Sequence, residues 1–278
     1  MHDIFLTPPL KTQGIKKKLT PWIREKVETF PKNTRFVEPF MGSCSVSLNM
    51  PFTRYLLCDA NPHLVAFYTA LKSDANLAYR AQRKMEEIYN RFQSEGGDVY
   101  YQLRESFNKS HDSVEFLVLN RSCFNGLMRF NKRGEFNSPF CRNTKRFNKA
   151  HRTKVVNQML RMREFLVEND VSLICTDFRN VADLVEEGDI VYADPPYMGR
   201  NTCYYNEWSD KDEDDLYSIL HKAKFYFLLS TWYNDKRRVN PCVEKYKKFK
   251  IMTREHFYHI GPKEENRYSV AEALISNF

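Results

Sequence analysis

The sequence predicts an α/β fold in which a mostly parallel sheet is interrupted by a mostly helical, basic insertion. Short apolar runs that suit buried strands alternate with helical segments near both ends of the chain, and this alternation is typical of a parallel sheet. The 278 residues are enough for one large domain or for a core domain with an insertion. We therefore expect one domain made of residues 1–61 and 150–278, with a second domain inserted over residues 62–149.

The first elements of the sheet lie in residues 1–61. Gly42 stands between the first expected strand and a short helix, and Asp59 ends the second strand. In chain order, we expect a helix over Lys16–Glu28, a strand over Arg35–Glu38, a short helix over Ser45–Asn49 and a strand over Tyr55–Cys58.

The insertion is expected to be helical and then to form a turn-rich ribbon over Arg129–Phe140. The ribbon turns at Asn131–Gly134, because Asn and Gly tolerate the backbone angles of tight turns. Helical spacing of apolar residues covers Leu64–Lys72, Asn76–Gln93, Val99–Asn108 and Val114–Leu119.

The α/β pattern returns from about Arg152. Short apolar runs suited to central strands are Ser172–Cys175, Asp189–Ala193 and Phe225–Leu229. Two further strands are expected at the end of the chain, over Lys250–His259 and Tyr268–Ile275, joined by Gly261–Asn266.

Basic residues are concentrated in one stretch. The chain carries 43 Lys and Arg against 35 Asp and Glu, a net charge of +8. Asn120–Lys154 alone holds ten basic residues and one acid, Glu135. A basic block inside a folded protein indicates a polyanionic partner, with a solvated basic face as the alternative.

Cysteine usage and hydropathy indicate a cytoplasmic protein. The seven cysteines form no C-x-x-C pair, which argues against a disulfide framework or a zinc finger and fits a reducing compartment. No apolar stretch reaches the roughly 20 residues of a membrane helix, and the first residues do not have the pattern of a signal peptide.

The strongest functional signal is Asp194-Pro195-Pro196-Tyr197, directly after the apolar run Ile190–Ala193. Open α/β sheets place their sites at such carboxyl ends of strands. Two prolines make a stiff turn, which fixes a carboxylate, exposed carbonyls and an aromatic ring relative to one another. A carboxylate and a carbonyl can each accept one hydrogen of an amino group, and the ring can stack on a base. This arrangement suits methylation of an exocyclic amine; a proline-rich turn without function is the alternative.

Two weaker signals indicate a nucleotide-like cofactor. The small residues after Arg35–Glu38, around Gly42, let a ligand approach the backbone. Asp59 ends the next strand, where an acid can accept hydrogen bonds from ribose hydroxyls, although a helix cap is the ordinary role of such an Asp. Lys11 and Lys16 in the N-terminal arm are placed to approach a cofactor carboxylate, and a plain basic arm is the alternative.

Together these motifs resemble the Dam family of adenine-N6 DNA methyltransferases, the α group. The shared order is Lys-x-x-Gly-x-Lys, Pro-Phe-x-Gly, a strand-end Asp, a helical insertion and Asp-Pro-Pro-Tyr, spanning nearly the whole chain. Within the family, the resemblance is to the EcoRV-type modification methylase, through stretches such as Cys58–Leu64, Leu119–Gly126 and Phe136–Cys141.

The resemblance implies a Rossmann-like, S-adenosylmethionine-dependent methyltransferase sheet with an inserted target-recognition domain. Asp194 through Tyr197, including Pro195 and Pro196, match the catalytic turn. Thr12 stands where the family usually has an aromatic residue, and Cys44 where it often has a second glycine. Residues expected to bind the cofactor are Thr12, Lys16, Phe40, Gly42, Asp59, Asp177, Phe178 and Asp194. No metal is expected, and His256 and His259 are interpreted as structural.

The resemblance also implies DNA contacts from the insertion. Phe124 would enter the base stack where the adenine leaves it, although by composition a packing aromatic is the simpler interpretation. Arg129 has the fork that matches O6 and N7 of guanine. Asn266 and Arg267 are further candidates near the end of the chain. The DNA-binding residues expected in the insertion are Phe124, Asn125, Leu127 and Arg129, with Arg142, Lys145 and Arg146 at phosphates.

The expected function is methylation of adenine N6 in double-stranded DNA, at a target beginning GAT such as GATATC. We expect a monomer that does not act at a membrane, with a cognate restriction endonuclease as a candidate partner; a phage or orphan methylase is equally consistent. Cytosine-N4 and RNA methyltransferases are alternatives, because the same turn suits any exocyclic amine. A non-catalytic DNA-binding accessory protein is a third, and a nicotinamide-dependent enzyme is weaker because no G-x-G-x-x-G follows the first strand.

Overall fold

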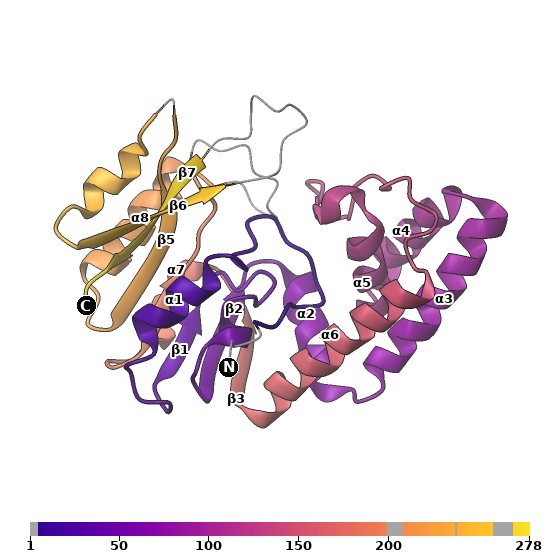
Figure 1. Ribbon diagram of the computed structural model, residues 1–278, viewed down its shortest axis with the longest axis horizontal. Helices are drawn as coiled ribbons and strands as arrows, with labels where there is room; N and C mark the ends of the chain where they lie inside the picture. Colours follow the sequence, from indigo (N-terminus) through magenta and orange to yellow (C-terminus); the bar gives the residue numbers. More distant parts are fainter. Residues whose placement is uncertain (1–4, 199–207, 237, 258–268) are drawn as a thin grey trace.

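The computed structural model describes residues 5–198, 208–236, 238–257 and 269–278. Within these residues, seven strands form one sheet in the order β3-β2-β1-β4-β5-β7-β6. Figure 1 shows the helical part of the chain beside the β3 edge of this sheet. The strands are β1 (Arg35–Glu38), β2 (Arg54–Asp59), β3 (Asp170–Cys175), β4 (Ile190–Ala193), β5 (Tyr226–Asn234), β6 (Lys250–Phe257) and β7 (Ser269–Ser276).

The sheet confirms the predicted Rossmann-like α/β fold. β7 runs antiparallel to β5 and β6, whereas the pairs β3–β2, β2–β1, β1–β4 and β4–β5 are parallel. After β1 the chain adds strands on one side, and with β4 it moves to the other side. The carboxyl ends of β1 and β4 therefore flank a topological switch point, where sheets of this kind bind ligands.

Strand residues alternate between two cores. Phe36 and Tyr192 belong to the core on one face of the sheet, whereas Val37 and Val191 belong to the core on the other face. This alternation follows from the two-residue period of a strand. Because β1 and β4 are buried on both faces, the apolar runs predicted from the sequence are continuous rather than alternating.

Helices cover the sheet and build the part of the molecule beside β3. They are α1 (Thr20–Val27), α2 (Pro62–Ser73), α3 (Leu77–Glu95), α4 (Asp98–Ser110), α5 (Ser113–Ser122), α6 (Lys149–Glu168), α7 (Phe178–Val181) and α8 (Asp210–His221). α2 packs on β2 and β3 as well as on α5, and α3 packs on α4, α5 and α6. The four helices predicted between residues 64 and 119 are confirmed as α2 to α5.

The predicted ribbon after α5 is also confirmed. Isolated bridges pair Phe130 with Phe136 and Cys123 with Phe140. At its turn, Asn131 Oδ1 accepts hydrogen bonds from the backbone N–H groups of Arg133 and Glu135, at 2.9 and 3.0 Å. The side chain of Asn131 therefore stabilises the turn, as Asn often does.

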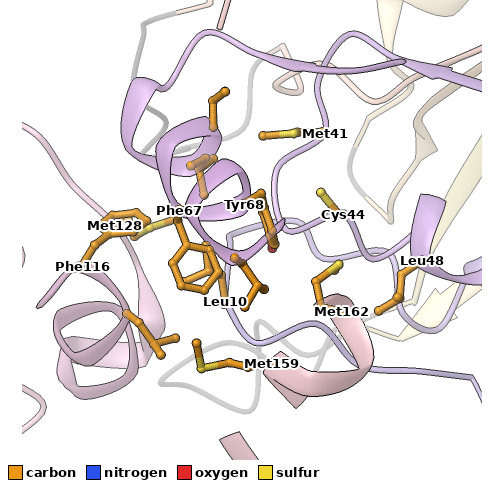
Figure 2. Close-up of a cluster of buried hydrophobic side chains, with 14 of the residues drawn as sticks. Leu10, Met41, Cys44, Leu48, Phe67, Tyr68, Phe116, Met128, Met159 and Met162 are labelled. Atoms are coloured by element: carbon orange, nitrogen blue, oxygen red, sulfur yellow. The ribbon is translucent and has the colours of Figure 1, made fainter. Parts of the chain in front are cut away.

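The N-terminal segment, which precedes α1, is buried at Pro8–Leu10, where the helical part meets the sheet. Figure 2 shows Leu10 among Phe67 and Tyr68 of α2 and Met159 of α6, and Leu10 is 1% exposed. The Tyr68 hydroxyl donates to the Ser43 carbonyl at 2.7 Å, which ties α2 to the turn after β1. A segment that precedes the first helix thus contributes to the core.

Several elements differ from the sequence prediction, among them the first helix, α6, α7 and α8. The first helix begins at Thr20 rather than Lys16, because Pro21 occupies its first turn and the Lys16 carbonyl accepts hydrogen bonds from residues 19 and 20. α6 and α8 were not predicted. Each begins at a side-chain cap, Asn148 for α6 and Ser209 for α8. The predicted turn Gly261–Asn266 lies outside the described residues. None of the described helices is long and apolar enough to cross a membrane.

Candidate active site

A cavity of about 230 Å³ lies at the carboxyl ends of β1, β2 and β4. Its walls come from the segment before α1, the turn after β1, the ends of β2 and β4, and the starts of α7 and α8. All eight residues predicted to bind a cofactor line it: Thr12, Lys16, Phe40, Gly42, Asp59, Asp177, Phe178 and Asp194. Residues far apart in the sequence thus meet at the switch point of the sheet.

Asp194 directly follows β4 and is held by a buried ammonium group. The Lys16 Nζ lies 2.7 Å from Asp194 Oδ1, and the Lys16 side chain is 5% exposed. The same Nζ donates to the Gly14 carbonyl at 3.0 Å and lies 4.7 Å from the centroid of the Tyr197 ring. Burial raises the pKa of the Asp194 carboxyl, and the positive charge of Lys16 acts in the opposite direction. The sequence indicated a site near Lys16 but not this ion pair.

The Tyr197 hydroxyl is anchored inside the sheet. It donates to Glu272 Oε2 at 2.8 Å and lies 3.2 Å from Ser230 Oγ. Glu272 is 1% exposed and comes from β7, so this contact links the turn after β4 to the antiparallel end of the sheet. Sequence reasoning missed Glu272. A single acid within the otherwise apolar run Ser269–Ser276 was a usable signal, because a buried charge needs a partner.

The two prolines of the turn lie in different surroundings. Both line a second, smaller cavity, but only Pro196 also lines the main one, and Pro195 is buried. The Trp232 Nε1 donates to the Met198 carbonyl at 3.2 Å and so fixes the end of the turn. Since proline lacks a backbone N–H and has a fixed φ, the turn is stiff and leaves the Pro195 carbonyl as an acceptor.

The turn after β1 is organised by Asp59. Asp59 accepts hydrogen bonds from the backbone N–H groups of Gly42 at 2.9 Å and Asn61 at 2.8 Å. Burial raises the pKa of Asp59 to about 6, although these two hydrogen bonds act in the opposite direction. Gly42 has a φ of 48° and Cys44 a φ of 57°. Cys44, which stands where the family often has a second glycine, thus adopts a left-handed backbone that is uncommon for a non-glycine residue.

Three aromatic rings that line the cavity, those of Phe40, Phe178 and Trp208, contact one another. The Phe178 ring lies 5.4 Å from the Phe40 ring and 5.3 Å from the Trp208 ring, and Phe40 and Trp208 meet edge to face at 5.6 Å. Trp208 lines the cavity but was not predicted as a site residue. Its signal was an aromatic residue directly before the capping sequence Ser209-x-x-Asp212.

The turn after α5 carries the predicted base-contacting residues. Phe124 is 52% exposed, Asn125 has a left-handed backbone, and Arg129 is exposed. Leu127 is half-buried, and its neighbour Met128 lines the cavity. The turn therefore reaches from the surface of the helical part to the wall of the cavity.

The three residues predicted at phosphates differ in exposure. Arg142 and Lys145 are exposed, whereas Arg146 is half-buried beside Arg121 and His151. Burial, and after it the positive charges of Arg121 and Arg146, lower the pKa of His151 to about 4. Arg142 and Lys145 are thus the better placed of the three for a partner in solvent.

The N-terminal segment is tied to α5 on its way to the cavity. Asn120 is fully buried; its amide accepts from the Lys11 N–H at 2.8 Å and donates to the Lys11 carbonyl at 2.7 Å. Arg121 donates to the Pro9 carbonyl at 3.1 Å. A Cβ on Gly126 would lie 2.7 Å from the Lys11 side chain, so this position requires glycine.

The candidate metal ligands and the C-terminal residues lie away from this cavity or outside the described residues. Among the described residues, no three His, Cys, Asp or Glu side chains are placed to hold a metal ion. His256 lies in β6, paired with Val270. His259, Asn266 and Arg267 lie outside the described residues.

Comparison with known proteins covers both the sheet and the insertion. Residues 13–260 match the family described as D12 class N6 adenine-specific DNA methyltransferase. The Retron Ec67 DNA adenine methylase of Escherichia coli is 32% identical over 218 residues, 76% of this chain and 71% of that protein. The DNA adenine methylase of Serratia marcescens is 32% identical over 225 residues, 77% of each chain. The Type II methyltransferase M.MjaIII of Methanocaldococcus jannaschii is 29% identical over 253 residues, 82% of this chain and 84% of that protein.

Proposed function

The chain belongs to the D12 class of N6 adenine-specific DNA methyltransferases, and we propose that it methylates an adenine that has left the duplex stack, with S-adenosylmethionine bound in the cavity at the switch point. One observation carries this proposal. The eight residues expected around a cofactor share a single cavity, and Asp194, at the start of the proline turn, is one of them. A cofactor and a base amine can therefore be brought together at one carboxylate.

The chemistry of the cavity fits S-adenosylmethionine. Asp59 already accepts two backbone N–H groups, and its remaining lone pairs suit ribose hydroxyls. The aromatic wall suits a purine ring. The acids that line the cavity are Glu38, Asp59, Asp177, Asp194 and Asp212, and Lys16 is a basic residue among them. This excess of acid favours a cation, and the bound cofactor supplies a methyl group on a positively charged sulfonium.

Asp194 and the proline turn prepare the amine. Its carboxylate and the Pro195 carbonyl each accept one hydrogen of the adenine N6 group, which draws the lone pair out of conjugation with the ring. Lys16 helps to keep Asp194 ionised, because its charge lowers the carboxyl pKa that burial raises. The Tyr197 ring, held by Glu272, stacks on the base. The methylated amine is acidic enough to lose its proton after transfer, so no separate general base is needed.

The insertion, residues 62–149, is proposed to bind the DNA. Phe124 is exposed at the tip of the turn whose Met128 lines the cavity, so a base displaced by Phe124 would leave the stack beside the cavity. Asn125 and Leu127 flank it, Arg129 would read a guanine next to the adenine, and Arg142, Lys145 and Arg146 would contact phosphates.

The finer identity rests on the sequence resemblance. An EcoRV-type enzyme would act at a site beginning GAT, such as GATATC, as the modification partner of a cytoplasmic restriction endonuclease. A phage or orphan methylase would have the same chemistry without the nuclease. We propose a monomer, because a single chain provides both the cavity and the exposed turn.

The test is methyl transfer by an Asp194→Ala variant, with Asp183→Ala as a control at an exposed acid outside the cavity. Radiolabelled S-adenosylmethionine and duplex DNA are used in single turnover, and the nucleosides are identified by mass analysis. We expect N6-methyladenine from the wild type and the control, and a loss of orders of magnitude for Asp194→Ala, since polarisation of the amine acts mainly in the transition state. N4-methylcytosine as the product, or a near-normal rate for Asp194→Ala, would refute the assignment.

A further inference from the structure

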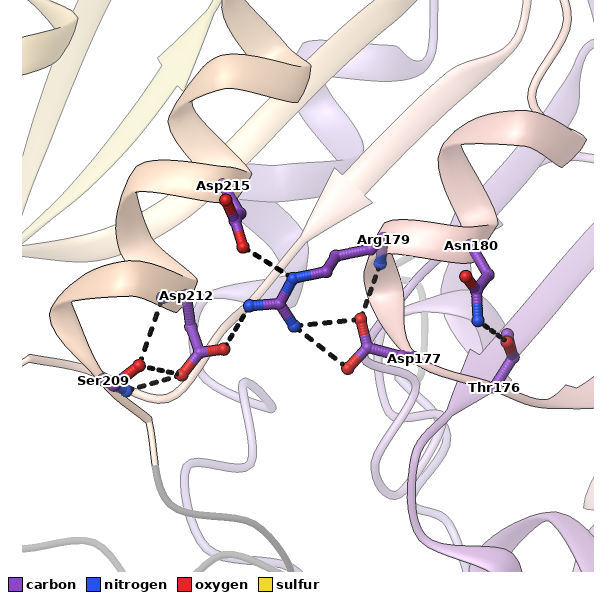
Figure 3. A network of polar contacts seen from close by, with 7 residues as sticks. All are labelled: Thr176, Asp177, Arg179, Asn180, Ser209, Asp212 and Asp215. Carbon is purple, nitrogen blue, oxygen red and sulfur yellow. Dashed lines mark hydrogen bonds and ion pairs between the residues drawn. The ribbon is translucent and has the colours of Figure 1, made fainter.

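One arginine beside the cavity contacts three carboxylates from two elements (Figure 3). Arg179, in α7, lies within 3.1 Å of Asp177 and 2.7 Å of Asp215, and it also contacts Asp212. Asp177 caps the start of α7, whereas Asp212 and Asp215 are in α8. Two of these acids, Asp177 and Asp212, line the cavity. Arg179 therefore connects two walls of the cavity.

The connection extends to Trp208. Ser209 and Asp212 form a reciprocal cap, in which Asp212 Oδ2 accepts from the Ser209 N–H at 2.7 Å and from its hydroxyl at 2.6 Å. Trp208 directly precedes this cap, and its Nε1 donates to Glu213 Oε2 at 3.2 Å. The Arg179 guanidinium also lies 4.5 Å from the centroid of the Phe178 ring. Arg179 thus contacts Phe178 of the aromatic wall directly and is connected to Trp208 through Asp212.

The charges explain why an arginine is needed at this position. The first turns of α8 contain five acids within Asp210–Asp215, and Asp177 faces them from α7. Without a cation between them, Asp177, Asp212 and Asp215 would repel one another and separate the two helix starts. Arg179 is about one-third exposed, and exposed pairs contribute little to overall stability. Its main effect is therefore on local geometry.

We propose that Arg179 is a positioning residue that holds Trp208 and Phe178 as the aromatic wall of a purine subsite, with Trp208 contacting the adenine ring of the cofactor. This inference rests on the proposed function, because it assigns the cavity to S-adenosylmethionine. Arg179 itself does not line the cavity. Its guanidinium is suited to the role, since one planar fork can pair with several carboxylates at fixed angles and lysine cannot.

The test is binding of S-adenosylhomocysteine by calorimetry, which needs no turnover. We expect Arg179→Met and Trp208→Leu each to weaken binding by about tenfold or more, as loss of a stacked aromatic contact implies, and Arg179→Lys to recover part of the loss. Methylation at saturating cofactor should change much less, because Asp194 and Lys16 are unaffected. Adding adenosine should change the tryptophan fluorescence of the wild type but not that of Trp208→Phe.

Arg35→Met is the matched control. Arg35 pairs with Asp189 through two nitrogens, its Nε at 3.1 Å, and donates to the Leu184 carbonyl, at the opposite ends of β1 and β4 from the cavity. The Arg35→Met substitution should lower the melting temperature without changing the affinity for S-adenosylhomocysteine.

Equal affinity of Arg179→Met and wild type, or equal loss of affinity in Arg35→Met, would overturn the inference. If the wild type binds no S-adenosylhomocysteine, the proposed function fails instead. If Arg179→Met does not fold, Asp215→Asn takes its place, because Asp215 pairs with Arg179 but does not line the cavity. Unchanged affinity in Asp215→Asn would then refute the role of Arg179.

Discussion

The cavity and the exposed face of the insertion are opposite in charge and are built differently. The cavity is lined by five acids with Lys16 among them, and its charges are fixed by hydrogen bonds and burial. The exposed face, formed by Arg129, Lys132, Arg133, Arg142 and Lys145, carries its charges on solvent-exposed side chains. The difference fits the two tasks that we propose. A cationic cofactor needs fixed acids at fixed distances, whereas a DNA backbone needs many adjustable cations.

The two regions meet along one segment. Lys11 is tied to α5 through Asn120, and Lys16, a short distance along the chain, pairs with Asp194. The segment from Lys11 to Lys16 therefore connects α5 of the insertion with the cavity. Each of the following predictions changes one side of this contrast and leaves the other intact.

The largest effect is expected from Lys16→Met, which removes the cation from the acidic cavity. Without the ammonium at 2.7 Å, the already raised pKa of Asp194 should rise further, because the nearby positive charge that lowers it is gone. The protonated acid is a poor acceptor for the adenine amine. Where the pH lies below the pKa of Asp194, the single-turnover rate should therefore fall about tenfold for each pH unit. A pH–rate profile measures this shift. An acidic limb at the same pH as in the wild type would show that Lys16 does not control Asp194.

Asp59→Asn should separate binding from stability. We expect S-adenosylmethionine affinity to fall about ten- to a hundredfold, since hydrogen bonds to a charged group contribute roughly 1.5–3 kcal/mol. Folding raises the pKa of Asp59 from 3.8 to about 6, so the ionised carboxylate costs stability above pH 6. An amide has only one oxygen, so the variant also loses one of the two backbone hydrogen bonds at every pH. Its melting temperature relative to the wild type should therefore be more favourable at pH 8 than at pH 4, with the change between pH 6 and pH 4. Calorimetry and thermal melts at both pH values test this, and unchanged affinity would remove Asp59 from the site.

Arg129→Ala acts on the exposed face. A lost bidentate contact to guanine should reduce discrimination at that base by roughly 1–3 kcal/mol, while cofactor affinity stays the same. The measurement is the methylation rate on duplexes with the guanine replaced, for wild type and variant. The same base preference in both enzymes would show that another residue reads the guanine.

Arg142→Ala should have the smallest effect. Loss of one phosphate contact weakens DNA binding at every sequence and reduces the salt dependence by about one ion. Lys222→Ala, at an exposed lysine after α8, is the matched control. Titrations at several salt concentrations compare the slopes, and identical slopes for Arg142→Ala and the control would place Arg142 away from the DNA.

The strands and the cavity were predictable because their signals are local. Phe36-Val37 and Ile190–Ala193 are short apolar stretches that suit buried strands, the acid Asp59 ends one parallel strand, and the acid Asp194 directly follows another. Parallel strands bring their carboxyl ends to one edge whatever the loops between them. The eight predicted cofactor residues therefore meet although most of the chain separates them.

The residues that were missed are those whose role depends on a distant partner. Glu272 is significant because Tyr197 lies against it, and Trp208 because α7 and α8 are joined by Arg179. α8 itself was missed because five acids at its start hide the apolar residues that follow. Such pairings are set by tertiary packing, and a single sequence contains no periodic signal for them.

The link between Lys11 and Asn120 also limits how this enzyme can be recombined. A chimera that receives residues 62–149 from a relative with another target would replace Asn120, Arg121 and Gly126 while keeping the native Lys11 and Pro9. Unless the donor supplies the same three residues, Pro9 and Lys11 lose their hydrogen bonds to α5. The segment that follows them would then no longer hold Lys16 opposite Asp194. The unit of exchange is therefore discontinuous: the N-terminal segment must be inherited together with the insertion, although the first helix and two strands of the sheet lie between them in the sequence.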